Sequence, residues 1–264
     1  MHELFLTASV PNDDLTRAVR ILQGFCGMKP QAFLCRRLMW EGPRLRTGLK
    51  GIPGDVISKQ TPAKQPLWKT LHEQLVRQSY VVALVYEIEK GAFGQSTEQQ
   101  DERPNHSLPS TCDQSPGTLR WNELPDPVDA RPVNTRAMLQ IDNERGLCST
   151  MKSIGYRFTG QMVQECYRFI NGNVIFDLSR YLQLPDDSQA SDYNSPLPAF
   201  ETLTPFDEEN KWILMISVRV VNGKDPDQAQ QAVSELMTTR SEFEGCFNFH
   251  MVARLTMDTR TRMT

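Results

Sequence analysis

An Asn171-Gly172 pair between two aromatic-rich stretches constrains the fold of this chain more than any other feature. The pair is a strong signal for a tight β-hairpin, because both central residues of a type I′ turn need a positive φ angle. With these two residues as the loop, Tyr167 lies opposite Phe176, and the stretch 162–182 forms two antiparallel strands. The chain is therefore expected to contain an antiparallel sheet whose register is set locally.

The two faces of this hairpin differ in chemistry. Arg168 and Asp177 lie on one face as diagonal neighbours, together with Cys166 and Ile175. The opposite face is aromatic and aliphatic, and it comprises Tyr167, Phe169, Val174, Phe176 and Leu178. Slipping the register by one residue would mix the two faces, which a half-buried sheet penalises. We therefore expect one aromatic sheet face in a core.

Both ends of the chain are predicted to follow the order strand, helix, strand. Alternating apolar and polar residues indicate the strands, and apolar residues at helical spacing indicate the helices. Asp225-Pro226 is a helix start with proline at the first helical position. The expected elements cover 2–10, 15–25 and 32–40 at the start, and 212–221, 226–237 and 246–255 at the end.

The middle of the chain adds further strands and one helix. A helix over 67–78 turns Trp68, Leu71 and Leu75 toward the core, and the run from Tyr80 to Ile88 is apolar on both faces. Because closure removes exposed edges, roughly eight to twelve strands with few helices favour a closed sheet. The expected fold class is α+β, mainly β: a large antiparallel multi-stranded β-barrel with flanking helices. Its remaining strands are expected at 118–123, 133–142 and 153–160.

The chain is expected to form a single β-barrel domain over 1–264, with mobile loops at 43–66, 91–117 and 186–204. Proline and glycine punctuate the first loop, and polar residues dominate the second. Eight basic residues and two acidic ones lie between Arg36 and Lys69. This basic stretch is either a solvated loop or a docking patch for an acidic partner.

Composition excludes several classes of protein. A net charge of −3 and a pI near 5.9 give no global attraction to nucleic acid, so no direct specific nucleic-acid binding is expected. No run approaches the ~20 apolar residues of a membrane span, and the N-terminus lacks the pattern of a secretion signal. The six cysteines are scattered without C-x-x-C spacing, which favours reduced thiols in the cytosol or nucleus over a disulfide framework.

Catalytic motifs are absent from the sequence, with one arrangement to consider. The four histidines are far apart, and no phosphate-binding or nucleophile-elbow motif occurs, so no metal, cofactor or catalytic residue is expected. Glu87 and Glu89 lie two residues apart on one predicted strand face, as carboxylates do that hold a divalent metal in tunnel-type triphosphate hydrolases. A second carboxylate pair on another strand is missing. A metal-dependent triphosphate hydrolase is therefore the alternative to a non-catalytic protein.

Taken in order, the segments resemble the Mediator subunit 18 family, whose members belong to the head module of the Mediator transcription coactivator. The likeness covers nearly the whole chain and is weakest over 91–117. It rests on the order and spacing of short segments rather than on one motif. These segments are His2 to Ala8, Trp40 to Pro43, Tyr156-Arg157-Phe158, Tyr167-Arg168-Phe169, Ser179 to Leu182, Pro205-Phe206-Asp207, Trp212-Ile213-Leu214, Val252 to Leu255 and Asp258-Thr259-Arg260.

The resemblance implies a barrel similar to the triphosphate tunnel folds but without their activity. It also implies a nuclear, non-catalytic subunit that links transcription regulators to RNA polymerase II. The implied partners are Mediator subunit 20, the C-terminal helix of Mediator subunit 8 and the RNA polymerase II machinery. No contact with a membrane is implied.

Several strands carry apolar residues on the face opposite their main core face. We expect either burial under the protein's own helices or, for some of these residues, a groove for a partner's amphipathic helix. These candidate partner-binding residues are Phe5, Leu34, Trp40, Ile213 and Met215.

Overall fold

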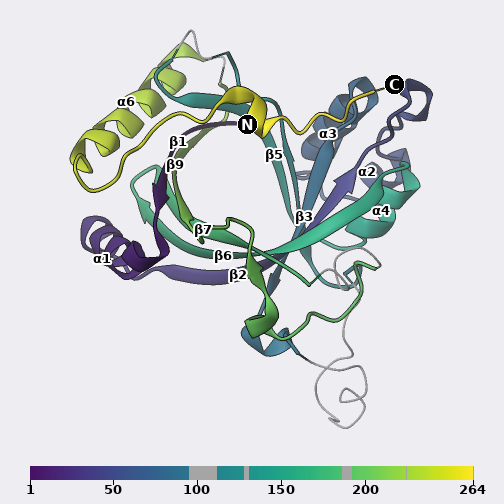
Figure 1. The fold of residues 1–264 in the computed structure, drawn as a ribbon. Coiled ribbons are helices and arrows are strands. Elements are labelled where there is room, and N and C mark those ends of the chain that lie inside the picture. The colour runs from purple at the N-terminus through teal and green to yellow at the C-terminus, as the bar shows by residue number, and fades with distance from the viewer. Residues whose placement is uncertain (95–111, 128–130, 186–191, 224, 264) are drawn as a thin grey trace.

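A closed antiparallel β-barrel forms the body of the protein in the computed structural model (Figure 1). The structure describes residues 1–94, 112–127, 131–185, 192–223 and 225–263. Within these residues the strand order is β6-β2-β3-β4-β5-β1-β9-β7, and β6 pairs with β7 to close the ring. The short β8 extends the edge of β7. The expected fold class, an antiparallel barrel with flanking helices, is confirmed.

The strands match most of the predicted ones within a few residues. Residues 153–160 do not form a strand of their own, because Ser153 ends a helix and the long β6 runs from Arg157 through the hairpin to Asn171. The observed bounds are β1 (His2–Val10), β2 (Gln31–Glu41), β3 (Val81–Ile88), β4 (Gly117–Asn122), β5 (Asn134–Glu144), β6 (Arg157–Asn171), β7 (Val174–Gln183), β8 (Thr204–Pro205) and β9 (Trp212–Val220).

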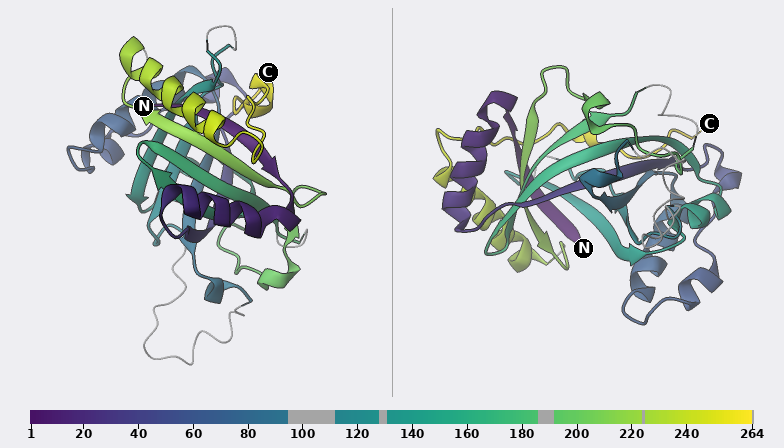
Figure 2. Two further views of the ribbon diagram at one scale, coloured as in Figure 1. Left: turned by 90° about the vertical axis from the view of Figure 1, so that its left-hand side faces the viewer. Right: turned by 90° about the horizontal axis from the view of Figure 1, so that it is seen from below.

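Helices cover the outside of the barrel on two sides (Figures 1 and 2). On one side, α1 (Leu15–Cys26) and α6 (Pro226–Glu242) pack on the outer faces of β1, β7 and β9. On the other side, α3 (Gln65–Arg77) and α4 (Leu147–Ser153) pack on β2 to β5. The short α2 (Gly54–Ser58) lies beside α3. The two main hydrophobic clusters therefore lie outside the ring, between strands and helices.

The central hairpin is present, but its predicted register is wrong. Asn171 pairs with Val174, so Gly172 and Asn173 form the loop, and Tyr167 lies opposite Leu178. Of the two loop residues only Gly172 has a positive φ, 58°, which is the pattern of a type II′ turn with glycine first. Moving the turn by one residue shifts the partners of each strand by two positions, so both predicted faces are kept. The aromatic face is buried under α1 and α6.

The helix ends follow local chemistry. Gly27 ends α1 in the left-handed conformation, with φ 62°. Asp225 caps α6, because its side chain accepts hydrogen bonds from the backbone N–H groups of Asp227 and Gln228. The start of α1 has no such cap, because the side chain of Asp14 makes no hydrogen bond to the first turn.

Two other predictions about local structure are wrong. The loop over 43–66 contains α2 and the first residues of α3. Residues 246–255 do not form a strand: apart from one bridge between His250 and Thr7, the segment is extended and then enters a short 3-10 helix at Arg254. Strand β5 pairs with β1 only over His2 to Phe5. The bridge from His250 therefore pairs with β1 at Thr7, beyond the part of this edge that β5 covers.

Parts of the two other predicted loops lie outside the described residues, namely 95–111 of the first and 186–191 of the second. All six cysteines are free thiols. Within the described part of the chain, no helix combines the length and the apolar character that crossing a membrane requires.

Candidate functional site

The inner wall of the barrel is rich in charged residues. On β1, Leu4 and Leu6 face the helices, so Glu3 and Phe5 between them face inward. The strand registers carry this alternation around the ring. Charged side chains on this inner wall include Glu3, Arg37, Glu87, Arg120, Arg136, Arg168, Asp177 and Arg219.

Some of these charges are paired. Nη2 of Arg136 lies 2.6 Å from Oε2 of Glu3, and its guanidinium stacks 4.8 Å from the ring centre of Phe5. Arg168 forms a second pair with Asp177. Arg37 has only neutral partners, since it donates to Oε1 of Gln164 at 3.0 Å and lies over the ring of Tyr181.

The carboxylates that motivated the hydrolase alternative do not form a metal site. Glu87 is the inward-facing residue near the end of β3, opposite Cys35, but β3 ends at Ile88 and Glu89 lies beyond it. The expectation that both share a strand face is therefore wrong. Among the described residues, no group of three or more histidine, cysteine or acidic side chains could hold a metal ion.

The five candidate partner-binding residues fall on both walls. Phe5, Ile213 and Met215 face inward, on β1 and β9. Leu34 and Trp40 face outward on β2 and are buried by the protein's own side chains, in separate clusters. Phe5 and Trp40 are fully buried, whereas Ile213 keeps 44% of its surface exposed. These residues do not form one groove, and partner contact at Ile213 with Met215 stays a prediction.

A basic pocket of about 570 Å³ lies where the C-terminal segment meets the end of α3. Arg46, Arg77, Arg260 and Arg262 line it, and Asp258 is the only acidic lining residue. Leu45 and Val76, next in sequence to two of these arginines, are exposed apolar side chains. This combination suits an acidic segment with apolar residues, so the docking interpretation of the basic stretch stays a prediction.

Sequence reasoning missed most of this pocket. Of its arginines, only Arg46 belongs to the basic stretch that the sequence singles out. The others come together because the backbone N–H of Val81 donates to Thr259 and that of Thr261 donates to Ser79, which brings the chain end beside α3. Such long-range contacts leave no local pattern.

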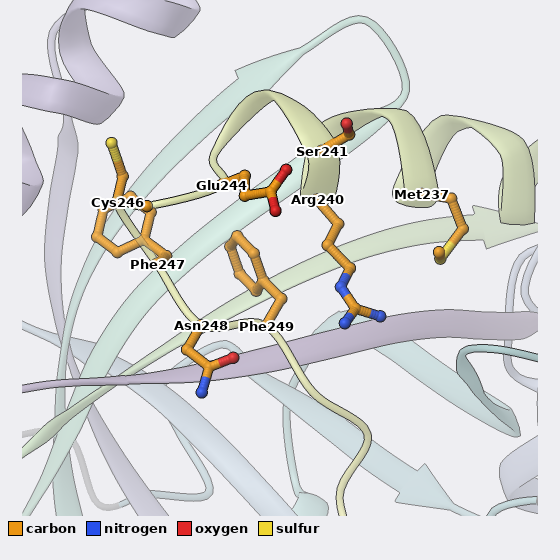
Figure 3. A pocket seen from close by; sticks show the side chains of 9 residues that line it. Met237, Arg240, Ser241, Glu244, Cys246, Phe247, Asn248 and Phe249 are labelled. Atoms are coloured by element: carbon orange, nitrogen blue, oxygen red, sulfur yellow. The ribbon is translucent and has the colours of Figure 1, made fainter.

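A second pocket, of about 540 Å³, lies at the C-terminal end of α6 (Figure 3). Met237, Arg240 and Glu244 contribute from the helix and its end, and Phe247 and Phe249 from the segment that follows. Figure 3 shows Arg240 extending from α6 toward this segment. Because Phe249 is buried against Phe243 and Phe247, the floor of the pocket belongs to the protein's own core.

Comparison with known proteins identifies the family. The family model described as "Med18 protein" matches residues 2–260. The chain belongs to the Med18 family. The resemblance predicted from the order of short segments is thereby confirmed.

Relatives of the Med18 family match along nearly the whole chain. A protein of Aspergillus fumigatus named "Mediator of RNA polymerase II transcription subunit 18" is 28% identical over 272 residues, covering 99% of this chain and 100% of the relative. The Aspergillus oryzae protein of the same name is 26% identical over 281 residues, with the same coverage. A chain in the structure of the Schizosaccharomyces pombe Mediator head module is similar in fold, with a TM-score of 0.63 and 14% identity, covering 96% of this chain and 99% of that chain.

Proposed function

We propose that this protein works as a scaffold in the Mediator complex, where it joins other subunits and links transcription regulators to RNA polymerase II. It is a structural subunit of the Med18 type and not an enzyme. The observation that carries this conclusion is the match of the family model to residues 2–260, supported by relatives that align end to end.

The proposed direct partners are Mediator subunit 20 and the C-terminal helix of Mediator subunit 8, and the proposed location is the nucleus. The Med18 relatives support membership of a Mediator complex, and the described chain offers surface for contacts. Several large apolar side chains remain exposed and are available for contact with partners. They include Leu45, Val76, Phe206, Ile213, Val221 and Leu255.

We place one partner contact at the barrel end that carries Ile213. Its side chain faces the interior at the start of β9, with Met215 two residues further in. Phe206, which is more than half exposed, precedes the same strand, and its backbone N–H donates to Tyr181 on β7. Ile213, Met215 and Phe206 thus give this end an apolar rim that suits the apolar face of a helix.

Co-expression with a tagged C-terminal segment of subunit 8, and separately with subunit 20, tests the proposal. The natural chain is expected to co-purify with both, and Ile213→Glu is expected to reduce recovery with the subunit 8 segment at least fivefold. Val221→Glu is the matched control, because Val221 is more exposed than Ile213 but lies at the other end of β9.

The two parts of the proposal fail in different ways. Equal recovery of both variants would show that the contact lies elsewhere on the barrel. Failure of the natural chain to co-purify with any Mediator subunit from nuclear extract would contradict the function itself.

A further inference from the structure

Two arginines on the inner wall have no hydrogen-bond or ion-pair partner among the described residues. Arg120 on β4 lies beside Gln140 of β5, and Arg219 on β9 lies beside Glu3 of β1. The Nε atoms of both are buried without a hydrogen bond, and neither guanidinium forms an ion pair with any described residue. Glu3 is engaged by Arg136 through its Oε2 atom, and Oε1 of Gln140 has no hydrogen-bond partner among the described residues.

The surroundings of Arg120 are strongly positive. Burial lowers the pKa of its guanidinium, and the charges of Arg37, Arg168 and Arg219 lower it further, while Asp177 acts in the opposite direction. Asp177 cannot neutralise this group of arginines, because both of its carboxylate oxygens already accept from Arg168. The inner wall thus carries five arginines against Glu3, Glu87 and Asp177, and Arg136 and Arg168 already engage two of these three carboxylates.

Such an arrangement is unfavourable without a counter-charge. A guanidinium whose Nε is buried without a hydrogen bond loses its hydration there without a replacement, and like charges at short range add to that cost. The strand pairing fixes the backbone positions of these arginines, since Arg120 pairs with Ala83 and Gln140, and Arg219 pairs with Glu3. The barrel thus holds two guanidinium groups, those of Arg120 and Arg219, whose Nε donors are unsatisfied.

We propose that Arg120 and Arg219, together with Arg37, bind a small multivalent oxyanion of the phosphate or diphosphate type inside the barrel. The planar guanidinium fork matches the oxygen geometry of phosphate. Oε1 of Gln140 is also buried without a partner, and it lies next to Arg120, where it can accept from the O–H group of a protonated phosphate. Sulfate carries no such proton at neutral pH.

Size and access fit a small ion. The Arg120 and Arg219 side chains are partly exposed although their Nε atoms are buried, so a small ion can reach them from solvent, and the 44% exposure of Ile213 shows that solvent reaches the inner wall at one end. No bond is made or broken in this binding, and it does not depend on the role proposed for the Mediator complex.

Thermal unfolding and calorimetric titration of the purified full chain test the proposal, with sodium phosphate, diphosphate and sulfate compared with sodium chloride at matched ionic strength. Diphosphate at saturation is expected to raise Tm by about 5 °C, phosphate less and sulfate least. Arg120→Met and Arg219→Met are each expected to weaken diphosphate binding about tenfold or more. Both variants are also expected to unfold at a higher temperature than the natural chain in anion-free buffer, because each removes an unpaired charge.

Arg157→Met is the control, since its side chain is 69% exposed and its removal changes net charge equally. It is expected to leave diphosphate binding unchanged. An increase in Tm that chloride reproduces at the same ionic strength would overturn the proposal. So would an Arg120→Met, Arg219→Met double variant that binds diphosphate as the natural chain does.

Discussion

Arg168 on β6 and Asp177 on β7 lie directly opposite each other and form a two-pronged ion pair. Nε and Nη2 of Arg168 donate to the two carboxylate oxygens of Asp177, each at 2.7 Å. The pair sits on the inner wall where β6 and β7 close the barrel, and the Arg168 guanidinium also lies 5.2 Å from the ring centre of Phe33. It therefore ties the closing seam to β2, the next strand around the ring.

Replacing Asp177 is expected to weaken this seam. Asp177→Asn leaves Arg168 without its carboxylate, and we expect a loss of about 2–3 kcal/mol in the free energy of unfolding. This is less than for a fully buried pair, because the Arg168 side chain is 23% exposed. Urea unfolding followed by circular dichroism measures the loss. Asp55→Asn is the control, since Asp55 and Lys59 are both largely exposed and should contribute under about 0.5 kcal/mol.

Two glycine-to-alanine substitutions should change stability in opposite directions. Gly172 in the hairpin loop has a φ of 58°, so Gly172→Ala is expected to cost about 1 kcal/mol. Gly24 lies within α1 with open space where a Cβ would be, and Gly24→Ala is expected to add about 0.5–1 kcal/mol. Thermal unfolding of both variants measures the difference. A Gly172→Ala protein as stable as the natural chain would show that the turn geometry is not needed.

Comparison of the predicted hairpin with the observed one shows what a local sequence pattern can predict. Alternation fixed the faces of the hairpin correctly, because the side-chain period of a strand is two and the turn error moved the pairing by an even number of positions. The turn type itself was wrong, since Asn171 pairs with Val174 as the last strand residue and Gly172 is the first turn residue. The alternation of 246–255 also led to a wrong strand prediction, because Phe247, Phe249 and Met251 pack in the cluster beneath α6 while the segment makes only one isolated bridge.

The arrangement of charged side chains on the inner wall could not be predicted from the sequence. That Arg168 lies on a strand follows from the pattern, but its convergence with Arg120 and Arg219 depends on the order of strands around the ring. Likewise, the alternation of Trp40 does not reveal that Tyr193, far along the chain, packs on its ring. Local signals identify faces, whereas closure of the barrel decides which faces meet.

The cap of α6 offers a separate test of local chemistry. Asp225→Ala removes the side-chain acceptor for two backbone N–H groups at the start of the helix, and we expect a loss of about 1 kcal/mol. Asp14→Ala provides the comparison, because Asp14 occupies the equivalent position before α1 without a side-chain cap and should change stability little. Equal losses in urea unfolding would show that helix charge, and not the cap, is responsible.

Alkaline pH is expected to destabilise the protein through its buried thiols. Cys148 on α4 is fully buried, and burial raises the pKa of its thiol to about 12. A raised pKa means that the folded state keeps its proton while the unfolded chain releases it near pH 9. The stabilising contribution is therefore complete below about pH 9 and is lost as pH rises from about 9 toward 12.

Each such group lowers the free energy of unfolding by about 1.4 kcal/mol per pH unit within that interval. Cys112 and Cys166, whose thiol pKa values are also raised by burial, add to the slope. Urea unfolding at several pH values between 8 and 11 should show Cys148→Ala with a slope smaller by about one proton than the natural chain. Cys246→Ala should keep the natural slope, because Cys246 is exposed. An unchanged slope in Cys148→Ala would show that this thiol ionises equally in the folded and unfolded chain.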